Sequence, residues 1–267
     1  MSRRPQGRHG GHVFLFAALA TLLWPLIYAV WMSFTPSELL EPPQGQWSLR
    51  WYRLFFASPQ WTAGLANSLV VATMTVAGSL VGGVGAALAL LRYHFRGKRL
   101  LAFAVLLPLF LPAVVLGMAL LPLVRLIGLW GTRASLAAAH SLWSLPVVYL
   151  VVRAALEDLD PDLERAARGL GASPVQTFLW ITVPVIAPAL LTGATMAFVL
   201  SLNEFIMALF LSTPAIETLP KVIWPSLRYT LTPLVAAASG VTLLLTLLGL
   251  FLLTQLLRLD RLLGRSR

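Results

Sequence analysis

One acidic residue, Glu204, lies inside a long apolar stretch of the chain, in the segment Ser201-Leu202-Asn203-Glu204-Phe205. A charge in the core of a bilayer costs about 2.5 kcal/mol or more, so such a residue normally faces a protein interior or an aqueous path. Two interpretations stay open. Glu204 lines a transport pathway with Ser201 and Asn203 beside it, which we prefer, or it is a structural acid that pairs with an arginine or with backbone of a partner subunit.

Small and bulky side chains separate onto two faces around Glu204 when this stretch is read as one helix. At steps of three and four residues the small face contains Ala194, Ala197, Ser201, Glu204 and Ala208, and the bulky face contains Phe198, Leu202, Phe205 and Leu209. Residues at these spacings share one side of a helix. We therefore expect the small face to contact protein or pathway and the bulky face to contact lipid.

Other residue patterns that support chemistry are missing from the sequence. There is no cysteine, no glycine-rich phosphate loop of the GxxxxGK[ST] type, no HExxH pair and no GxSxG segment. The four histidines are scattered, and we interpret His140 as a hydrogen-bonded packing residue instead of a metal ligand. The chain is therefore predicted not to be an enzyme and to hold no metal.

The composition is that of a membrane protein. Of the 267 residues, 58% are hydrophobic and 11% are charged, whereas soluble domains carry about 25% charged residues. Apolar runs recur near the length of about 20 residues that crosses a bilayer core. We predict an all-α, polytopic membrane protein that forms a single domain over residues 1–267, with six transmembrane helices: Val13–Phe34, Asn67–Leu91, Leu100–Val124, Ala134–Val152, Ile186–Leu211 and Thr232–Leu257.

The net charge of +10 follows the predicted topology and does not indicate nucleic-acid binding. Fourteen of the 20 lysines and arginines fall in the two termini and in the loops after the second and fourth predicted helices, and six fall on the opposite side. Lysine and arginine are retained on the cytoplasmic side during insertion. We expect both termini and the loop from about residue 154 to 185 to be cytoplasmic.

That loop contains the signals of a helix, a sharp turn and a second helix. Acidic residues and Pro161 precede a short helix predicted over Leu163–Leu170, and acids suit the positive end of a helix dipole. Gly171 can adopt the left-handed conformation that ends a helix, and Pro174 suits the first turn of the next helix. The small residues Ala166, Ala167 and Gly171 would allow another protein to approach closely. From spacing alone, a docking surface and an ordinary loop are both possible.

The segment Glu164–Leu190 resembles the signature cytoplasmic loop of ABC-importer permeases, in which Glu-Ala-Ala is followed by a glycine and by a proline that begins the next span. Ala166, Ala167, Gly171 and Pro184 match this pattern. The resemblance implies a coupling helix that docks into a cytoplasmic ATPase, with ATP and magnesium on that subunit and no cofactor on this chain. Arg165 departs from the pattern, which has glutamate there. The adjacent Glu164 points about 100° away on a helix, which puts in doubt a salt bridge from that position to the ATPase.

The Asn203-Glu204 element and the proline-containing segment from Glu217 to Pro233 resemble permeases of the spermidine/putrescine type. That resemblance implies a bacterial inner-membrane protein that carries a small cationic solute. Its implied partners are membrane lipid, a second homologous permease, two copies of the ATPase and an extracytoplasmic solute-binding protein. Importers of iron, phosphonates or opine-like compounds share much of the pattern and stay possible. A secondary transporter is the other alternative, although such carriers often show inverted repeats and several intramembrane ionisable groups.

Overall fold

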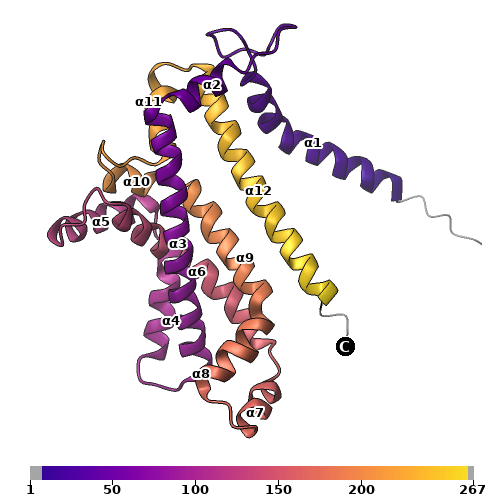
Figure 1. Cartoon of the computed structure of the whole chain (residues 1–267), viewed down its shortest axis with the longest axis vertical. Helices are drawn as coiled ribbons and strands as arrows, with labels where there is room; N and C mark the ends of the chain where they lie inside the picture. Colours follow the sequence, from indigo (N-terminus) through magenta and orange to yellow (C-terminus); the bar gives the residue numbers. More distant parts are fainter. Residues whose placement is uncertain (1–7, 264–267) are drawn as a thin grey trace, which may run out of the picture. The chain divides into compact units, whose positions relative to one another are not determined.

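The computed structural model describes residues 8–263, and every regular element in that range is helical apart from one isolated bridge between Thr213 and Ile216. This confirms the all-α prediction. In chain order the elements (Figure 1) are α1 (Arg8–Met32), α2 (Arg50–Ala57), α3 (Pro59–Arg92), α4 (Lys98–Leu106), the 3₁₀ helix η1 (Leu107–Phe110), α5 (Ala113–Leu126), α6 (Arg133–Glu157), α7 (Pro161–Gly169), α8 (Pro174–Thr177), the π-helix η2 (Phe178–Thr182), α9 (Val183–Leu202), α10 (Ile206–Leu211), α11 (Leu219–Tyr229) and α12 (Pro233–Leu263).

Five of the described helical stretches are long and apolar enough to cross a membrane, and the number is six if one bent pair of helices is counted as a single span. The five are Leu15–Met32, Pro59–Arg92, Arg133–Glu157, Pro174–Asn203 and Pro233–Gln255. The sequence predicted an unbroken third span over Leu100–Val124. That prediction is wrong in detail, because the chain bends by 114° between Lys98–Phe110 and Ala113–Leu126. Leu111 is extended (φ −95°, ψ 133°) because the residue before a proline avoids the helical conformation.

Two compact units make up the chain. One contains Met1–Thr62 and Ile223–Leu244, and the other contains Ala63–Val222 and Leu245–Arg267. In the first unit, the Ser33 and Tyr52 hydroxyls lie 2.7 Å apart and the Phe34 ring packs on Trp47 and Tyr52. Both predicted functional elements, the loop after α6 and the stretch around Glu204, belong to the second unit.

Helix α6 forms the centre of the second unit, with α9 packed along it and α3 against another side. Glycines bring α3 close to α6: a Cβ at Gly78, Gly82 or Gly83 would lie within 3.0 Å of a side-chain atom of α6. Gly85, on the same helix, faces open space.

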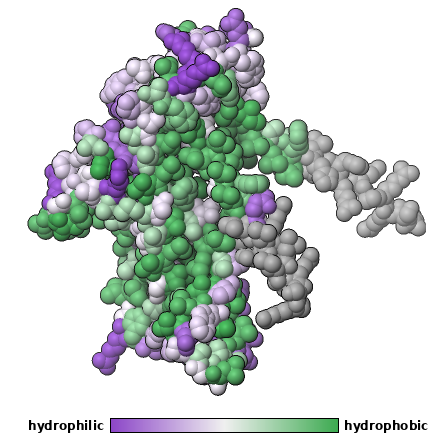
Figure 2. All heavy atoms as spheres, viewed as in Figure 1, coloured by the Kyte–Doolittle hydropathy of each residue, from purple (hydrophilic) through white to green (hydrophobic). Residues whose placement is uncertain are grey.

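The exposed surface of the spans is apolar. Large side chains such as Val81 and Phe103 are more than half exposed. On the face shown in Figure 2, hydrophobic residues cover the middle of the helices of the second unit. Such a surface is suited to lipid, because a lipid-facing helix need not hide apolar side chains from water.

Candidate functional site

The predicted fifth span is broken at the residues that the sequence singled out. Helix α9 ends at Leu202, Asn203 is its C-cap, and α10 starts at Ile206 after a short non-helical stretch. The prediction of one continuous helix over Ile186–Leu211 is therefore wrong. A break leaves backbone amides without helical partners, and within a membrane those amides need another acceptor.

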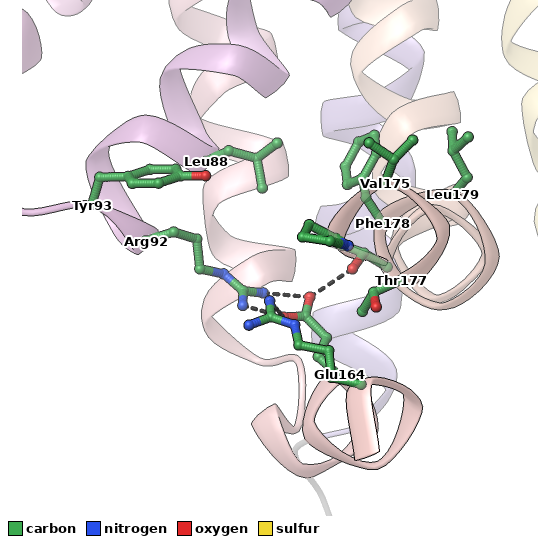
Figure 3. A pocket seen from close by; sticks show the side chains of 11 residues that line it. Leu88, Arg92, Tyr93, Glu164, Val175, Thr177, Phe178 and Leu179 are labelled. Atoms are coloured by element: carbon green, nitrogen blue, oxygen red, sulfur yellow. Dashed lines mark hydrogen bonds and ion pairs between the residues drawn. The ribbon is translucent and has the colours of Figure 1, made fainter. Parts of the chain in front are cut away.

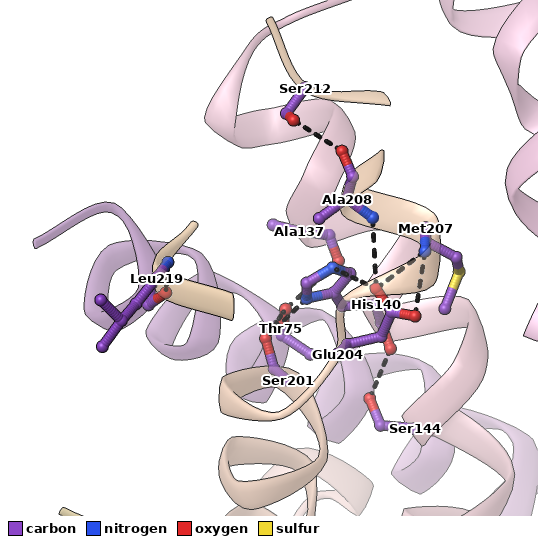
Figure 4. Close-up of polar contacts among 11 residues, drawn as sticks. Thr75, Ala137, His140, Ser144, Ser201, Glu204, Met207, Ala208, Ser212 and Leu219 are labelled. Atoms are coloured by element: carbon purple, nitrogen blue, oxygen red, sulfur yellow. Dashed lines mark hydrogen bonds and ion pairs between the residues drawn. The ribbon is translucent and has the colours of Figure 1, made fainter. Parts of the chain in front are cut away.

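Glu204 supplies that acceptor. Its two carboxylate oxygens each accept a hydrogen bond from the Met207 amide at 3.0 Å, and Oε2 also accepts one from the Ala208 amide at 3.2 Å. The side chain is 6% exposed. Figure 4 shows the carboxylate between these amides and His140. Glu204 thus stabilises the first turn of α10, where a negative charge is favoured by the free amides.

A buried polar network joins this break to two other helices. His140 of α6 places Nε2 3.4 Å from Glu204 Oε2, without the alignment of a hydrogen bond, and Nδ1 2.8 Å from the Ser201 hydroxyl. Ser201 in turn donates to Thr75 of α3 at 3.3 Å, and Ser144 donates to the His140 carbonyl at 2.8 Å (Figure 4). Histidine 140 is therefore a hydrogen-bonded packing residue, as predicted.

The three predicted pathway residues do not come together. Ser201 and Glu204 are buried and meet around His140, whereas Asn203 is exposed and donates to the Val199 carbonyl at 2.8 Å. The predicted small face is buried at Ala197, Ser201, Glu204 and Ala208. The predicted lipid face is wrong at Leu202, the last residue of α9, which is 2% exposed. The sequence offered no signal that Thr75 would join this group.

The loop after α6 has the local structure that the sequence predicts. The Asp160 side chain accepts from the Asp162 amide and caps α7, and Gly171 adopts a left-handed conformation (φ +90°) after it. Ser173 and Gln176 then form a reciprocal capping box at the start of α8, with Pro174 in its first turn. A helix, a glycine turn and a second helix are confirmed.

Helix α7 presents different residues to the chain and to its surroundings. Among its own residues only Glu164 is buried. Leu163 is 43% exposed and Leu170, directly after the helix, is 91% exposed, with the exposed Ala166 between them at helical spacing. Arg165 points outward and pairs with Asp162 at 2.6 Å. Ala167 is half-buried and Gly171 is exposed. The i, i+3, i+7 spacing of Leu163, Ala166 and Leu170 is the sequence signal that could have predicted this outward apolar stripe.

Glu164 is tied to other parts of the same unit. It forms a two-pronged ion pair with Arg92 at the end of α3, in which Nη2 donates to Oε1 at 2.7 Å, and it accepts from the Thr182 hydroxyl at 2.6 Å. These residues line a cavity of about 580 Å³ between the ends of α3, α7 and α8 (Figure 3). Burial alone would raise the pKa of Glu164. The hydrogen bonds from Arg92 and Thr182 and the charges of Arg92 and Arg168 outweigh it and hold that pKa below its usual range.

Within the described part of the chain, no group of three or more His, Cys, Asp or Glu side chains could hold a metal ion. A family model described as "Binding-protein-dependent transport system inner membrane component" matches residues 55–263. The chain belongs to this family. This permease is accordingly the membrane-spanning, non-catalytic component of a binding-protein-dependent ABC importer, and it is a multi-pass protein of the inner membrane. The alternative of an ATPase-independent secondary transporter is set aside.

Relatives of the permease include polyamine systems. It is 34% identical to the putrescine transport system permease PotI of Escherichia coli K12, with 89% of this chain and 86% of PotI covered. It is 30% identical to the spermidine/putrescine permease PotC of Haemophilus influenzae, with 92% and 95% covered. The trehalose permease SugB of Mycobacterium tuberculosis is 35% identical over a shorter region, 63% of this chain and 62% of SugB.

Solved ABC transporters share the fold of the permease. A chain from a bacterial transporter that imports the acidic polysaccharide alginate superposes with a TM-score of 0.72 at 17% identity, with 97% of this chain and 98% of that chain covered. A chain of the methionine transporter MetNI in an inward-facing conformation gives a TM-score of 0.63 at 17% identity, with 75% and 96% covered.

Proposed function

We propose that this permease carries a small cationic solute of the polyamine class, with putrescine the first candidate. The observation that carries the proposal is the similarity to PotI, which extends over 89% of this chain. The similarity to PotC covers a comparable length. Iron, phosphonate or opine-like solutes remain the alternatives to polyamines, and the SugB match shows that sugar-transporting relatives also fall within this range of identity.

In this proposal, the break between α9 and α10 lies on the translocation pathway. Irregular backbone at membrane depth is tolerated where it is buried in protein or lines a water-filled cavity. Glu204 is on the buried side of the break and Asn203 is exposed. Asn203 therefore offers a polar contact to a passing solute, while the Glu204 carboxylate contributes negative potential from behind it. A carboxylate acts more strongly on an ammonium group there than in bulk water, because the effective dielectric is lower.

Helix α7 is the element that would contact the ATPase. Leu163, Ala166 and Leu170 form an outward apolar stripe, and a leucine that is 91% exposed beside a polar loop is typical of a surface with a partner. Two ATPase copies, a second homologous permease and an extracytoplasmic solute-binding protein complete the proposed importer. An alginate transporter with the same fold is known in complex with its periplasmic protein.

The proposed orientation puts both termini and the loop containing α7 in the cytoplasm, because 14 of the 20 basic residues fall on that side. The chain has no cysteine, so a single cysteine introduced at the exposed Ser173 reports the orientation directly. An impermeant thiol reagent should label S173C only from the cytoplasmic side. Labelling from outside intact cells would overturn the orientation.

The substrate is tested with the assembled importer in proteoliposomes, together with its binding protein. Uptake of radiolabelled putrescine that requires ATP and is competed by spermidine is the expected result. Absence of ATP-dependent putrescine uptake, together with ATP-dependent uptake of radiolabelled ferric iron, a phosphonate or trehalose by the same importer, would refute the polyamine assignment and leave the importer assignment in place.

A further inference from the structure

Helix α7 directs one buried side chain into its unit. Glu164 is the only buried residue within Pro161–Gly169, and the neighbouring Arg165, Ala166 and Arg168 are exposed. The helix also packs against α8 and η2. The Glu164 carboxylate provides its side-chain hydrogen bonds to α3 and η2.

The Glu164 carboxylate reaches two long helices at once. Arg92 is the last residue of α3, and Thr182 is the last residue of the π-helix that leads directly into α9. The Arg92 guanidinium and the Thr182 hydroxyl both donate to the Glu164 carboxylate. Dashed lines in Figure 3 join Arg92 to Glu164. Two-pronged arginine–carboxylate pairs are stronger and more directional than single contacts.

The same two helices meet again at the other candidate site. Thr75 of α3 and Ser201 of α9 are hydrogen-bonded to each other, and Ser201 also contacts His140 next to the α9–α10 break. A connected series of packed helices and polar contacts thus runs from α7 to the break. Such networks carry coupling when the connecting elements have two arrangements.

We propose that Glu164, Arg92 and Thr182 form a clamp that transmits movement of α7 to α3 and α9, so that Glu164 serves energy coupling as a positioning residue and not as an ATPase contact. The inference rests on the proposed docking of α7 to an ATPase. The family pattern has glutamate at the position where this chain has Arg165. In the proposed clamp the acidic residue on which α7 depends is Glu164, one position earlier.

The test uses the complete importer, reconstituted in nanodiscs with its ATPase and binding protein. Four quantities are measured for each variant: co-purification of the ATPase, basal ATP hydrolysis, hydrolysis stimulated by the loaded binding protein, and solute transported per ATP. Thr182→Val removes only the hydroxyl that faces Glu164, and Glu164→Gln removes the charge. The charge-swapped double variant Arg92→Glu/Glu164→Arg rebuilds the pair in reverse. Glu157→Gln is the matched control, since it removes an equal charge from an exposed ion pair with Arg153 at the end of α6.

For Glu164→Gln we expect the ATPase to co-purify normally and the stimulated rate to fall on the order of tenfold, the factor that corresponds to one charge-assisted hydrogen bond. Thr182→Val should show a smaller fall in the same quantity. The double variant should regain transport per ATP that Arg92→Glu and Glu164→Arg each lose alone, and Glu157→Gln should resemble the wild type.

Three results would overturn the clamp. The first is loss of ATPase co-purification in Glu164→Gln, which would place Glu164 at the docking surface. The second is unchanged stimulation in both Glu164→Gln and Thr182→Val. The third is a double variant no better than its parents although it inserts and assembles. Failure of the wild-type chain to co-purify any ATPase would instead refute the proposed docking itself.

Discussion

Replacing Glu204 by alanine tests whether its carboxylate maintains the break between α9 and α10. The substitution leaves the amides of Met207 and Ala208 without their acceptor in a buried place. Each buried donor left unpaired costs about 1–3 kcal/mol, so the free energy of unfolding should fall by roughly 2–6 kcal/mol. Glu204→Gln keeps one acceptor oxygen and loses the charge. Neutral hydrogen bonds are about half as strong as charge-assisted ones, so Glu204→Gln weakens the contacts to the amides without removing them. The free energy of unfolding should therefore fall less than in Glu204→Ala, by roughly 1–2 kcal/mol.

The assay is titration of the purified chain in mild detergent with sodium dodecyl sulfate, followed by tryptophan fluorescence. Asn203→Ala is the neighbouring control: its side chain is exposed and bonds only the Val199 carbonyl, so its stability should stay close to the wild type. If Asn203 lines the pathway, this control should instead lower solute uptake in the assembled importer.

A Glu204→Ala variant as stable as the wild type would refute the structural role of the carboxylate. A Glu204→Gln variant with wild-type stability and assembly but reduced polyamine uptake would favour direct contact of Glu204 with the solute, the interpretation that the sequence first suggested.

Three further predictions concern the loop and the helix contacts. Gly171→Val should strain the turn, where φ is +90°, by about 1–3 kcal/mol, and it should lower stimulated ATP hydrolysis while membrane insertion stays intact. The control Gly169→Ala, which is also in open space, should be neutral. Normal stimulation in Gly171→Val would contradict the coupling role. Gly83→Ala should lower the free energy of unfolding by about 1–3 kcal/mol, because its Cβ would lie 3.0 Å from the Tyr149 amide nitrogen. Gly85→Ala should leave the free energy of unfolding unchanged, because Gly85 faces open space. Equal effects of the two variants would refute the α3–α6 packing. The pKa of Glu164 is lowered in the folded chain, so its contribution to stability is complete above the usual glutamate pKa of about 4.3 and is lost as the pH falls through the lower folded pKa. The difference in free energy of unfolding between the wild type and Glu164→Gln should therefore shrink with acidification. A difference that does not depend on pH would contradict this.

Residues close together in the sequence determined the loop that contains α7. Asp160 before Pro161, Gly171 after the helix, and Ser173 with Gln176 each act on backbone groups no more than four residues away. Such signals need no tertiary structure, because the capping side chain and the amide that it satisfies are neighbours in any folded arrangement. Composition and the repeated apolar runs likewise determined the membrane class, since a helix needs about 20 predominantly apolar residues to cross a bilayer core.

Tertiary structure decided which way the acidic residues face and where the fifth predicted span breaks. Glu164 and Arg92 are 72 positions apart, His140 and Ser201 are 61 apart, and Thr75 and Ser201 are 126 apart. Nothing in the spacing of Glu164 within its own helix distinguishes a carboxylate that meets an ATPase from one that binds Arg92 and Thr182. The choice of Gly83 over Gly85 for close packing depends equally on the rotation of α3 against α6.

The break after Leu202 shows the physical reason most directly. An apolar run around one glutamate is compatible with a continuous helix, in which each amide bonds the carbonyl four residues earlier. The Glu204 carboxylate can replace those bonds only where burial removes water as a competitor, and His140 and the surrounding helices supply that burial. The sequence therefore placed a charge in the span, while the packing of α3, α6 and α9 decided that it would end one helix and begin the next.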